Sequence, residues 1–294
     1  MDGMAEFRID LLPAETAGGT LPDTARRVTV LRLDDGTPTS TDDMVVEEVP
    51  VAMAYNGIVH AVMLATPEHL EDMALGFSLS ENIIATPDEL FEVAVVTGCE
   101  GVEVRMDIPL DRFMKLKGQR RSLAGRTGCG VCGVESLQAM ARAGRPVTGG
   151  VAVAPAAVAR ALDLFSRQQA LHGLTGAVHG VAWAAADGTI LALREDVGRH
   201  NALDKLIGWL VTNGVDPASG FALTSSRASY EMVQKATRAG IGCLVAISAP
   251  TGLAVRMADA CGLTLAGFAR GRRLVVYTHA DRLTAASPSV EPAR

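Results

Sequence analysis

The stretch that decides the fold class runs from residue 221 to residue 268: FALTSSRASYEMVQKATRAGIGCLVAISAPTGLAVRMADACGLTLAGF. Short aliphatic runs alternate in it with segments of helical periodicity, and turns rich in Ser, Gly and Pro separate them. The pattern predicts strands at 221–224, 243–248 and 263–268 and helices at 230–239 and 253–260. Alternation of this kind indicates a sheet with helices on both of its faces.

The alternation continues on both sides of this stretch and extends the domain to residues 151–282. A helix from residue 155 has Val158, Ala161, Leu162 and Phe165 in register on one face. Further strands are expected at 177–185, 189–193 and 274–278, and a further helix at 202–211. The fold class is therefore α/β with a three-layer α/β/α second domain, and residues 283–294 are expected to be a disordered tail.

A small β-rich α+β domain is expected at residues 27–110, after a mobile arm at residues 1–26. Its firmest element is a hairpin at Asn56-Gly57, a dipeptide that tolerates the positive φ angles of a tight turn. The turn joins two runs, 44–55 and 58–64. Other strands are expected at 28–33, 91–97 and 102–108.

Two helix starts follow one pattern in this domain. Thr66 precedes Pro67, which predicts a helix with Thr66 as its cap and proline at the first helical position. Thr86 repeats the signal, with Glu89 three residues later as in a capping box.

Composition narrows the function classes. The chain has 294 residues, enough for two domains, and 48% of them are hydrophobic but only 4% aromatic, so an aliphatic core is expected. A net charge of −6 and a pI near 5.6 argue against nucleic-acid binding. The sequence has no apolar run of membrane-spanning length and no signal-peptide pattern at its start. We therefore expect a cytoplasmic protein with no membrane and no nucleic-acid partner.

Residues 111–150 are expected to form a basic, glycine-rich linker that carries a Cys-x-x-Cys loop, Cys129 to Cys132. Six cations precede the two thiols, with no acid among them after Asp111: Arg112, Lys115, Lys117, Arg120, Arg121 and Arg126. A short helix is expected at residues 134–143, directly after the loop. Nearby cations and a helix N-terminus both lower the pKa of a thiol, so the pair is set up to be reactive.

Four kinds of thiol site compete at this loop. Structural zinc needs four ligands, and the other cysteines, Cys99, Cys243 and Cys261, make no second Cys-x-x-Cys, so we expect no metal held by the protein. A thioredoxin-like site would place the motif after a strand in a shorter chain. A zinc deaminase needs His-x-Glu, whereas Val181 stands two places after His179. The flanking glycines favour a mobile loop that accepts and passes on sulfur or another electrophile.

Polar residues gather at the predicted strand ends of the second domain. The segment 195–205 packs acid, base, imidazole and amide between a strand and a helix, where α/β sheets bind ligands, although a cap-and-salt-bridge network would use the same residues. His179 is either a core histidine or a functional one. The candidate ligand residues here are His179, Arg199, His200, Ser226, Ser229 and Ser248. Hydroxyls at a helix start suit phosphate, and Ser229 also suits plain N-capping.

A third group joins the last two predicted strands. It contains one aromatic ring and three arginines, Phe268, Ala269, Arg270, Gly271, Arg272 and Arg273. Arginine matches phosphate oxygens, and a ring or guanidinium plane can stack on a base; an exposed hairpin tip is the alternative interpretation.

Together these motifs resemble the FdhD/NarQ family, the accessory sulfurtransferases of formate dehydrogenase. The resemblance covers roughly residues 28–282 and rests on Cys129 to Gly133, Glu195 to Lys205, Glu231 to Val233 with Ala239 to Ile241, and Ser248 to Thr251. Ala177 stands where the family commonly has a second glycine before the histidine. The resemblance implies a small N-terminal domain, a second domain of cytidine-deaminase-like fold without the deaminase zinc site, and a homodimer.

The resemblance also implies a function. The protein would take persulfide sulfur from a cysteine desulfurase and deliver it to the molybdenum cofactor, bis(molybdopterin guanine dinucleotide), a bound substrate, before the cofactor enters the catalytic subunit of formate dehydrogenase. Cys129 matches the cysteine that carries the persulfide, and Cys132 would assist or resolve it. Phe268 to Arg273 match the cofactor-binding segment. The alternative is a chaperone that holds the cofactor or the dehydrogenase without transferring sulfur.

Overall fold

The computed structural model describes residues 22–98, 100–123 and 144–283. The predictions for residues 1–21 and 284–294, for the thiols Cys129 and Cys132, and for the helix at 134–143 lie outside the described residues.

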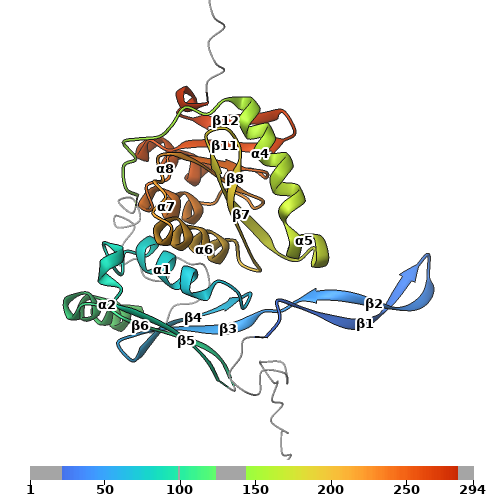
Figure 1. Cartoon of the computed structure of the whole chain (residues 1–294), viewed down its shortest axis with the longest axis horizontal. Helices are drawn as coiled ribbons and strands as arrows, with labels where there is room; N and C mark the ends of the chain where they lie inside the picture. The colour runs from blue at the N-terminus through green and yellow to red at the C-terminus, as the bar shows by residue number, and fades with distance from the viewer. Residues whose placement is uncertain (1–21, 99, 124–143, 284–294) are drawn as a thin grey trace, which may run out of the picture.

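A six-stranded mixed sheet forms the centre of the second domain (Figure 1). Its strand order is β12-β11-β10-β9-β7-β8. The neighbours β9, β10 and β11 are parallel, while β7 and β12 run antiparallel to the strands they pair with. The strands are β7 (His179–Ala185), β8 (Ile190–Asp196), β9 (Gly220–Thr224), β10 (Cys243–Ala246), β11 (Thr264–Arg270) and β12 (Arg273–Thr278).

Helices cover both faces of this sheet, as predicted. Successive residues of a strand point to opposite faces, so Ala222 and Leu244 join one core cluster while Leu223 and Val245 join another. The first cluster packs under three helices, α6 (Arg199–Thr212), α7 (Tyr230–Arg238) and α8 (Gly252–Cys261). The second packs under α4 (Pro155–Gln168), which is followed by the short helix α5 (Ala170–Thr175). The domain therefore has three layers.

The small domain is a four-stranded sheet with order β4-β3-β6-β5 and helix α1 (Leu70–Ser80) packed on it. The strands are β3 (Val49–Tyr55), β4 (Ile58–Ala65), β5 (Glu92–Gly98) and β6 (Gly101–Asp107). The predicted hairpin is confirmed: Asn56 and Gly57 have φ of 47° and 77° between β3 and β4. The Asn56 amide also donates to Ile108 O and accepts from its N–H, both at 3.0 Å, which ties the turn to the end of β6.

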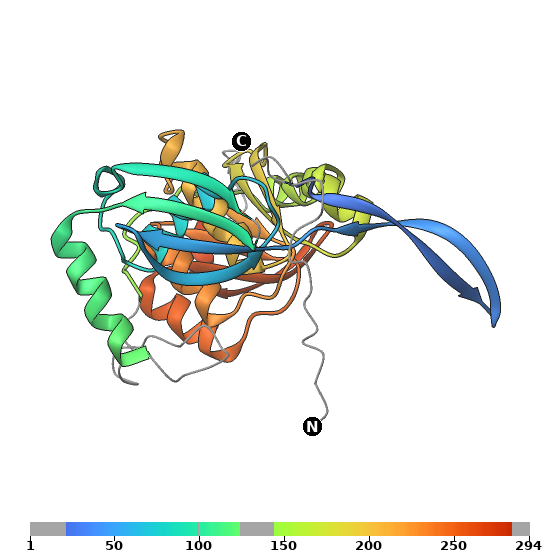
Figure 2. The same ribbon diagram turned by 90° about the horizontal axis from the view of Figure 1, so that it is seen from below.

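The predicted strand at 44–55 is wrong, because two strands share it. Strand β2 (Thr37–Val46) ends before β3 and pairs with β1 (Ala25–Asp34) instead. Asp35 and Gly36, both with positive φ, make the turn between them. The pair projects from the body as a two-stranded arm (Figure 2), so ordered structure begins within the predicted mobile arm.

The first predicted helix start is wrong, whereas the second begins at its predicted cap, Thr86, but continues only as a short 3₁₀ turn. Helix α1 begins at Leu70, after His69 with φ of 54°, so Thr66 does not cap it. The Thr66 hydroxyl instead accepts from Val197 N, in the second domain. At the second start only the 3₁₀ turn η2 (Pro87–Glu89) forms, with the Glu89 carboxylate accepting from Ala85 N at 2.6 Å.

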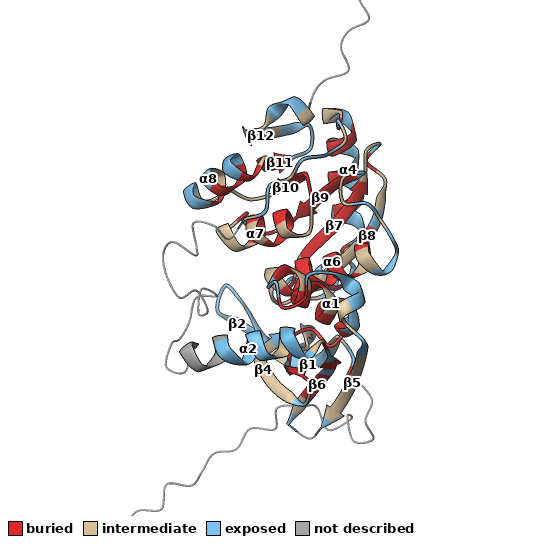
Figure 3. Cartoon of the chain, turned by 90° about the vertical axis from the view of Figure 1, so that its left-hand side faces the viewer, coloured by how far each residue is buried: buried red, intermediate tan, exposed pale blue. Residues whose placement is uncertain are grey.

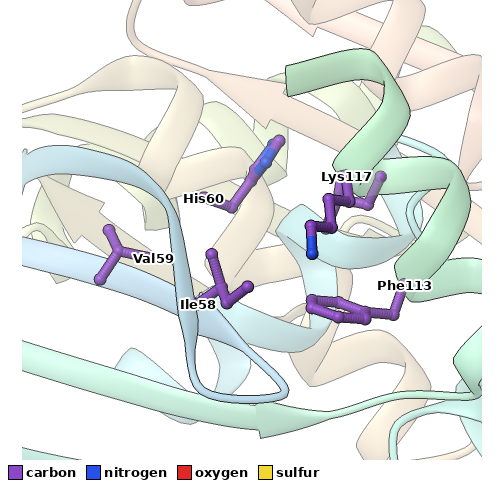
Figure 4. A pocket seen from close by; sticks show the side chains of 6 residues that line it. Ile58, Val59, His60, Phe113 and Lys117 are labelled. Atoms are coloured by element: carbon purple, nitrogen blue, oxygen red, sulfur yellow. The ribbon is translucent and has the colours of Figure 1, made fainter. Parts of the chain in front are cut away.

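The basic linker is partly helical. Residues 110–123 form helix α2 (Leu110–Leu123), so the first part of the segment predicted as a linker at 111–150 is helical. The reason is a short apolar face, because Phe113 and Leu116 pack against the small domain's core. Figure 4 shows Phe113 and Lys117 of α2 facing Ile58 and His60 of β4 across a small cavity.

The two domains meet where α1 crosses α6, and Figure 3 shows buried residues on both helices at this crossing. Two glycines make close approach possible. A Cβ at Gly76 would overlap the backbone of Asp204, and a Cβ at Gly208 would overlap the backbone of Asp72. Among the described residues no helix is long and apolar enough to cross a membrane.

Candidate functional site

The predicted ligand residues of the second domain lie along one edge of the six-stranded sheet. Strands β9, β10 and β11 end at this edge because they are parallel. Strand β7 starts there, since Val181 pairs with Thr224, and β8 ends there, since His179 pairs with Asp196. The loops after the carboxyl ends of strands are where α/β sheets bind ligands.

Backbone bonds join the loops at this edge. Ser225 N donates to Gly180 O, and Gly180 N donates to Ser225 Oγ, both at 3.0 Å. The loop before α7 touches the loop before α8 through a bridge between Ala228 and Pro250. The two serine-containing turns, after β9 and after β10, therefore lie side by side.

The arginine-containing segment lies next to Ser248. Phe268 N donates to Ser248 O at 3.1 Å, and a shift in strand register follows Gly267. Phe268 has φ of 50°, an uncommon value for a residue with a side chain, and the residue is 53% exposed. Such outliers concentrate at functional sites. Arg270, Arg272 and Arg273 are exposed at the tip of the β11–β12 hairpin, so ring and guanidinium groups share one end of the sheet.

Three buried polar atoms at this edge make no hydrogen bond of regular geometry to a described residue. They are Arg199 Nε, in the first turn of α6, Ser229 Oγ, directly before α7, and His200 Nε2. Of the three, His200 Nε2 has a charged neighbour, because it lies 2.8 Å from Glu231 Oε2. Ser229 occupies the N-cap position but its side chain makes no capping bond, so capping does not account for it. Buried polar atoms normally find a partner, and a guanidinium and a hydroxyl beside two helix N-termini suit an anion.

Ser226 has a different environment. It is buried, its Oγ lies 2.9 Å from Thr224 Oγ1, and it donates to Arg227 O at 3.1 Å. These bonds hold the turn after β9 in shape. Ser226 therefore has a structural role: it stabilises the loop that carries Ser229.

Two histidines line the same edge with different partners. Burial, and then the charge of Arg199, lower the pKa of His179, which keeps its imidazole neutral at pH 7. His200 Nε2 lies 2.8 Å from Glu231 Oε2 at the start of α7. The hydrogen bond from His200 is the main reason that the pKa of Glu231 is lowered. His179 can thus accept a hydrogen bond, whereas His200 is held by a carboxylate.

The segment 195–205 divides between two roles. Arg199 and His200 face the site, but its buried members form the salt-bridge network that was the alternative interpretation. Lys205 Nζ lies 2.7 Å from Asp196 Oδ2 and donates to Thr66 O at 3.0 Å. Asn201 Nδ2 donates to Asp196 Oδ1 and to a backbone carbonyl of β4. These bonds tie the small domain to the second domain.

A second buried network involves residues that the motif search missed. Lys235 Nζ lies 2.9 Å from Asp204 Oδ2 and 2.7 Å from Glu81 Oε1, and donates to Ser80 Oγ at 2.9 Å. Burial alone would lower the pKa of Lys235, but the two carboxylates raise it overall. The signal in the sequence is periodic: Lys235 falls on the apolar face of α7, beside Met232 and Ala236.

The segment with the two thiols is attached to both domains. It leaves the small domain at the end of α2 and the described chain resumes at Gly144, where a Cβ would overlap Cys261 Sγ of α8. Val147 N then donates to Cys261 O at 2.7 Å. Cys243 and Cys261 are buried, and burial raises the pKa of Cys243 to about 12. Neither thiol is therefore reactive at neutral pH.

The model of one protein family, described as the FdhD/NarQ family, matches residues 46–284. The chain belongs to the FdhD/NarQ family. The match spans both domains, including α2, the thiol segment and the ligand edge, so the resemblance inferred from the motifs is confirmed.

Named members of the FdhD/NarQ family are closely similar. The sulfur carrier protein FdhD of Xanthomonas campestris pv. campestris is 51% identical over 265 residues, covering 90% of this chain and 94% of the relative. The protein of the same name from Cupriavidus necator is 49% identical, covering 91% and 93%. A crystal structure from Desulfotalea psychrophila, described as a formate dehydrogenase accessory protein, superposes with a TM-score of 0.72 at 22% identity, covering 89% of this chain and 100% of that one. This last likeness supports the fold.

Proposed function

We propose that this protein is a sulfur carrier, a sulfurtransferase that moves persulfide sulfur from a cysteine desulfurase to bis(molybdopterin guanine dinucleotide) for formate dehydrogenase. The names of its relatives support sulfur transfer and a formate dehydrogenase partner. The proposal includes a cytidine-deaminase-like second domain, a homodimer and a cytoplasmic location. The observation that carries the proposal is that this member of the FdhD/NarQ family has both a Cys-x-x-Cys and a sheet edge where buried donors without a partner suit an anion.

The proposed loading step is an exchange at sulfur. The Cys129 thiolate attacks the outer sulfur of a donor persulfide, a new S–S bond forms at Cys129, and the donor cysteine leaves as a thiolate. No net oxidation occurs. If Cys132 then attacks Cys129 Sγ, sulfide leaves with two electrons and a Cys129–Cys132 disulfide remains. A cellular dithiol reductant must reduce that disulfide before the next cycle.

The ligand edge would bind the cofactor as substrate. Arg199 and Ser229 offer donors to phosphate oxygens, and neutral His179 offers an acceptor. Phe268 presents a ring on which a guanine can stack, beside the exposed arginines of the β11–β12 tip. These groups bind and orient the substrate, while the chemistry at sulfur belongs to Cys129.

Incubation with a cysteine desulfurase and cysteine is expected to add about 32 Da, one sulfur atom, to the intact protein. The adduct should be lost in Cys129→Ala and on treatment with a thiol reductant. Cys261→Ala is the matched control and should load normally, because that thiol is buried with a raised pKa. A wild-type protein that gains no mass would favour the alternative, a cofactor-binding chaperone.

Arg199→Ala is expected to weaken the binding of GDP, which carries the guanosine and phosphates of the cofactor, about 10-fold. The reason is the loss of a charged donor that has no partner for its Nε among the described residues. Isothermal titration calorimetry measures the effect. Arg167→Ala, which removes an exposed guanidinium paired with Asp163 on α4, is the control. Equal affinities for GDP in the two variants would remove Arg199 from the site.

A further inference from the structure

Helix α2 presents an apolar stripe to solvent. Leu110 is 70% and Met114 is 58% exposed, and positions four apart share one face of a helix. The opposite face is the one that packs on the small domain, through Phe113 and Leu116. Figure 3 colours most of α2 as exposed. Among the described residues, Leu110 and Met114 therefore contribute little to the packing of the fold.

Gly118 continues the stripe by another four residues. A Cβ there would meet nothing within 4 Å, so neither packing nor backbone conformation requires glycine at this position. Glycine inside a helix destabilises the helix relative to alanine. A bare backbone does allow another molecule to approach closely, which is one of the few uses of glycine in a helix.

The charges beside the stripe are mainly positive. Lys115 and Lys117 are exposed, Lys117 on the side of α2 that faces β4, whereas Arg112 is held by Glu89 at 3.0 Å. Asp111, in the first turn, is the one acid of α2. The sequence has no further acid before Glu135. An apolar contact bordered by lysines matches a protein surface that presents carboxylates.

The position of the stripe in the chain, close to Cys129, indicates which kind of protein would bind there. Leu123, the last residue of α2, precedes Cys129 by six positions, a chain length that spans at most about 20 Å. A protein seated on α2 is thus within reach of the carrier thiol. We propose that the stripe Leu110–Met114–Gly118, with Lys115 and Lys117, is the docking surface for the acidic-faced protein that donates the sulfur. This inference rests on the proposed sulfur-carrier function.

The test compares two sulfur donors. The variant Met114→Glu/Lys115→Glu is loaded either by a cysteine desulfurase with cysteine or by inorganic polysulfide, which needs no docking, and the added sulfur is followed by mass. We expect a loss of at least 10-fold in the initial rate with the desulfurase and an unchanged rate with polysulfide. The control Leu174→Ser/Arg167→Glu changes an exposed leucine on α5 and an exposed arginine on α4, and should match wild type with both donors.

The other outcomes are separable. A wild-type rate with the desulfurase in the α2 variant overturns the docking surface and leaves the proposed function intact. An equal loss with both donors also overturns it, because the change then acts on the thiols. A wild-type protein that gains sulfur from neither donor overturns the proposed function itself. As a second measurement, wild-type binding to the desulfurase should weaken with rising salt, and a Lys115→Glu/Lys117→Glu variant should lose that dependence.

Discussion

Replacing Lys235 with methionine is expected to lower the free energy of unfolding by about 3–5 kcal/mol. The lysine side chain is 5% exposed, and its partner Asp204 is 1% exposed. Methionine would leave the Asp204 carboxylate buried with only the Ser80 hydroxyl, which donates to Asp204 Oδ1 at 2.7 Å. An uncompensated buried charge is among the largest single-site effects on stability. Urea unfolding followed by circular dichroism measures the loss.

A double variant distinguishes the cost of leaving the Asp204 carboxylate unpaired from the cost of losing the packing of the lysine side chain. In Lys235→Met/Asp204→Leu both charges are gone, so a large part of the loss should be recovered. Arg167→Met, which breaks an exposed pair four residues apart on α4, is the control and should change stability by no more than about 0.5 kcal/mol. If Lys235→Met is as stable as this control, Lys235 and Asp204 do not form the buried pair described above.

The pH dependence of this contribution has a definite sign. The pKa of Lys235 is raised above its ordinary value of 10.5 in the folded protein. A raised pKa means that the folded state binds the proton more tightly, so the contribution is complete below pH 10.5. It is lost only as the pH rises through the raised pKa. The contribution of Lys235 itself should therefore be constant from pH 6 to pH 9. Burial raises the pKa of Asp204, and Lys235→Met removes the main charge that lowers it, so the difference in stability between wild type and Lys235→Met should shrink as the falling pH protonates Asp204 in the variant.

Turn residues and hydrophobic periodicity were enough to predict most strands and helices of the second domain. The strands and helices between residues 221 and 268 are bounded by Gly, Ser and Pro and have clear periodicity, and the structure places each within a few residues of its predicted range. The Asn56-Gly57 hairpin was equally secure, because the turn type depends on those two residues alone. The sequence also predicted that the loops after β9, β10 and β11 lie at one edge of the sheet, because parallel strands have their carboxyl ends at the same edge.

The errors have a common physical origin in tertiary contacts. Thr66 has the residue type of a helix cap, but its hydroxyl and backbone bond to Val197, Asp196 and Lys205 of the other domain. The split of residues 44–55 depends on pairing with β1, and residues 110–123 become helical because two of them pack on the small domain's core. Which members of segment 195–205 join the two domains likewise depends on α1, far away in the sequence.

Gly76→Ala is expected to destabilise the protein by about 1–3 kcal/mol, although helix propensity alone predicts a gain of about 1 kcal/mol. The added Cβ at Gly76 would overlap Asp204 O, and a backbone atom cannot move aside as the end of a side chain can. Gly118→Ala is the matched control, because this helical glycine faces open space; it should stabilise by about 0.5–1 kcal/mol. Unfolding curves of the two variants should therefore shift in opposite directions. A shift of both toward higher stability would mean that α1 and α6 are farther apart than described.

The reciprocal variant makes the test specific to the crossing of α1 and α6. Gly208→Ala should destabilise for the same reason, because its Cβ would overlap Asp72 O on the other helix. Once one alanine has pushed the helices apart, the second has more room, so the loss in Gly76→Ala/Gly208→Ala should be smaller than the sum of the single losses. Separation of the helices would also stretch the Lys235–Asp204 and Lys205–Asp196 bonds, which lie at the same interface. Part of the measured loss should therefore disappear when Gly76→Ala is made in the Lys235→Met/Asp204→Leu background, since one of those bonds is already absent there.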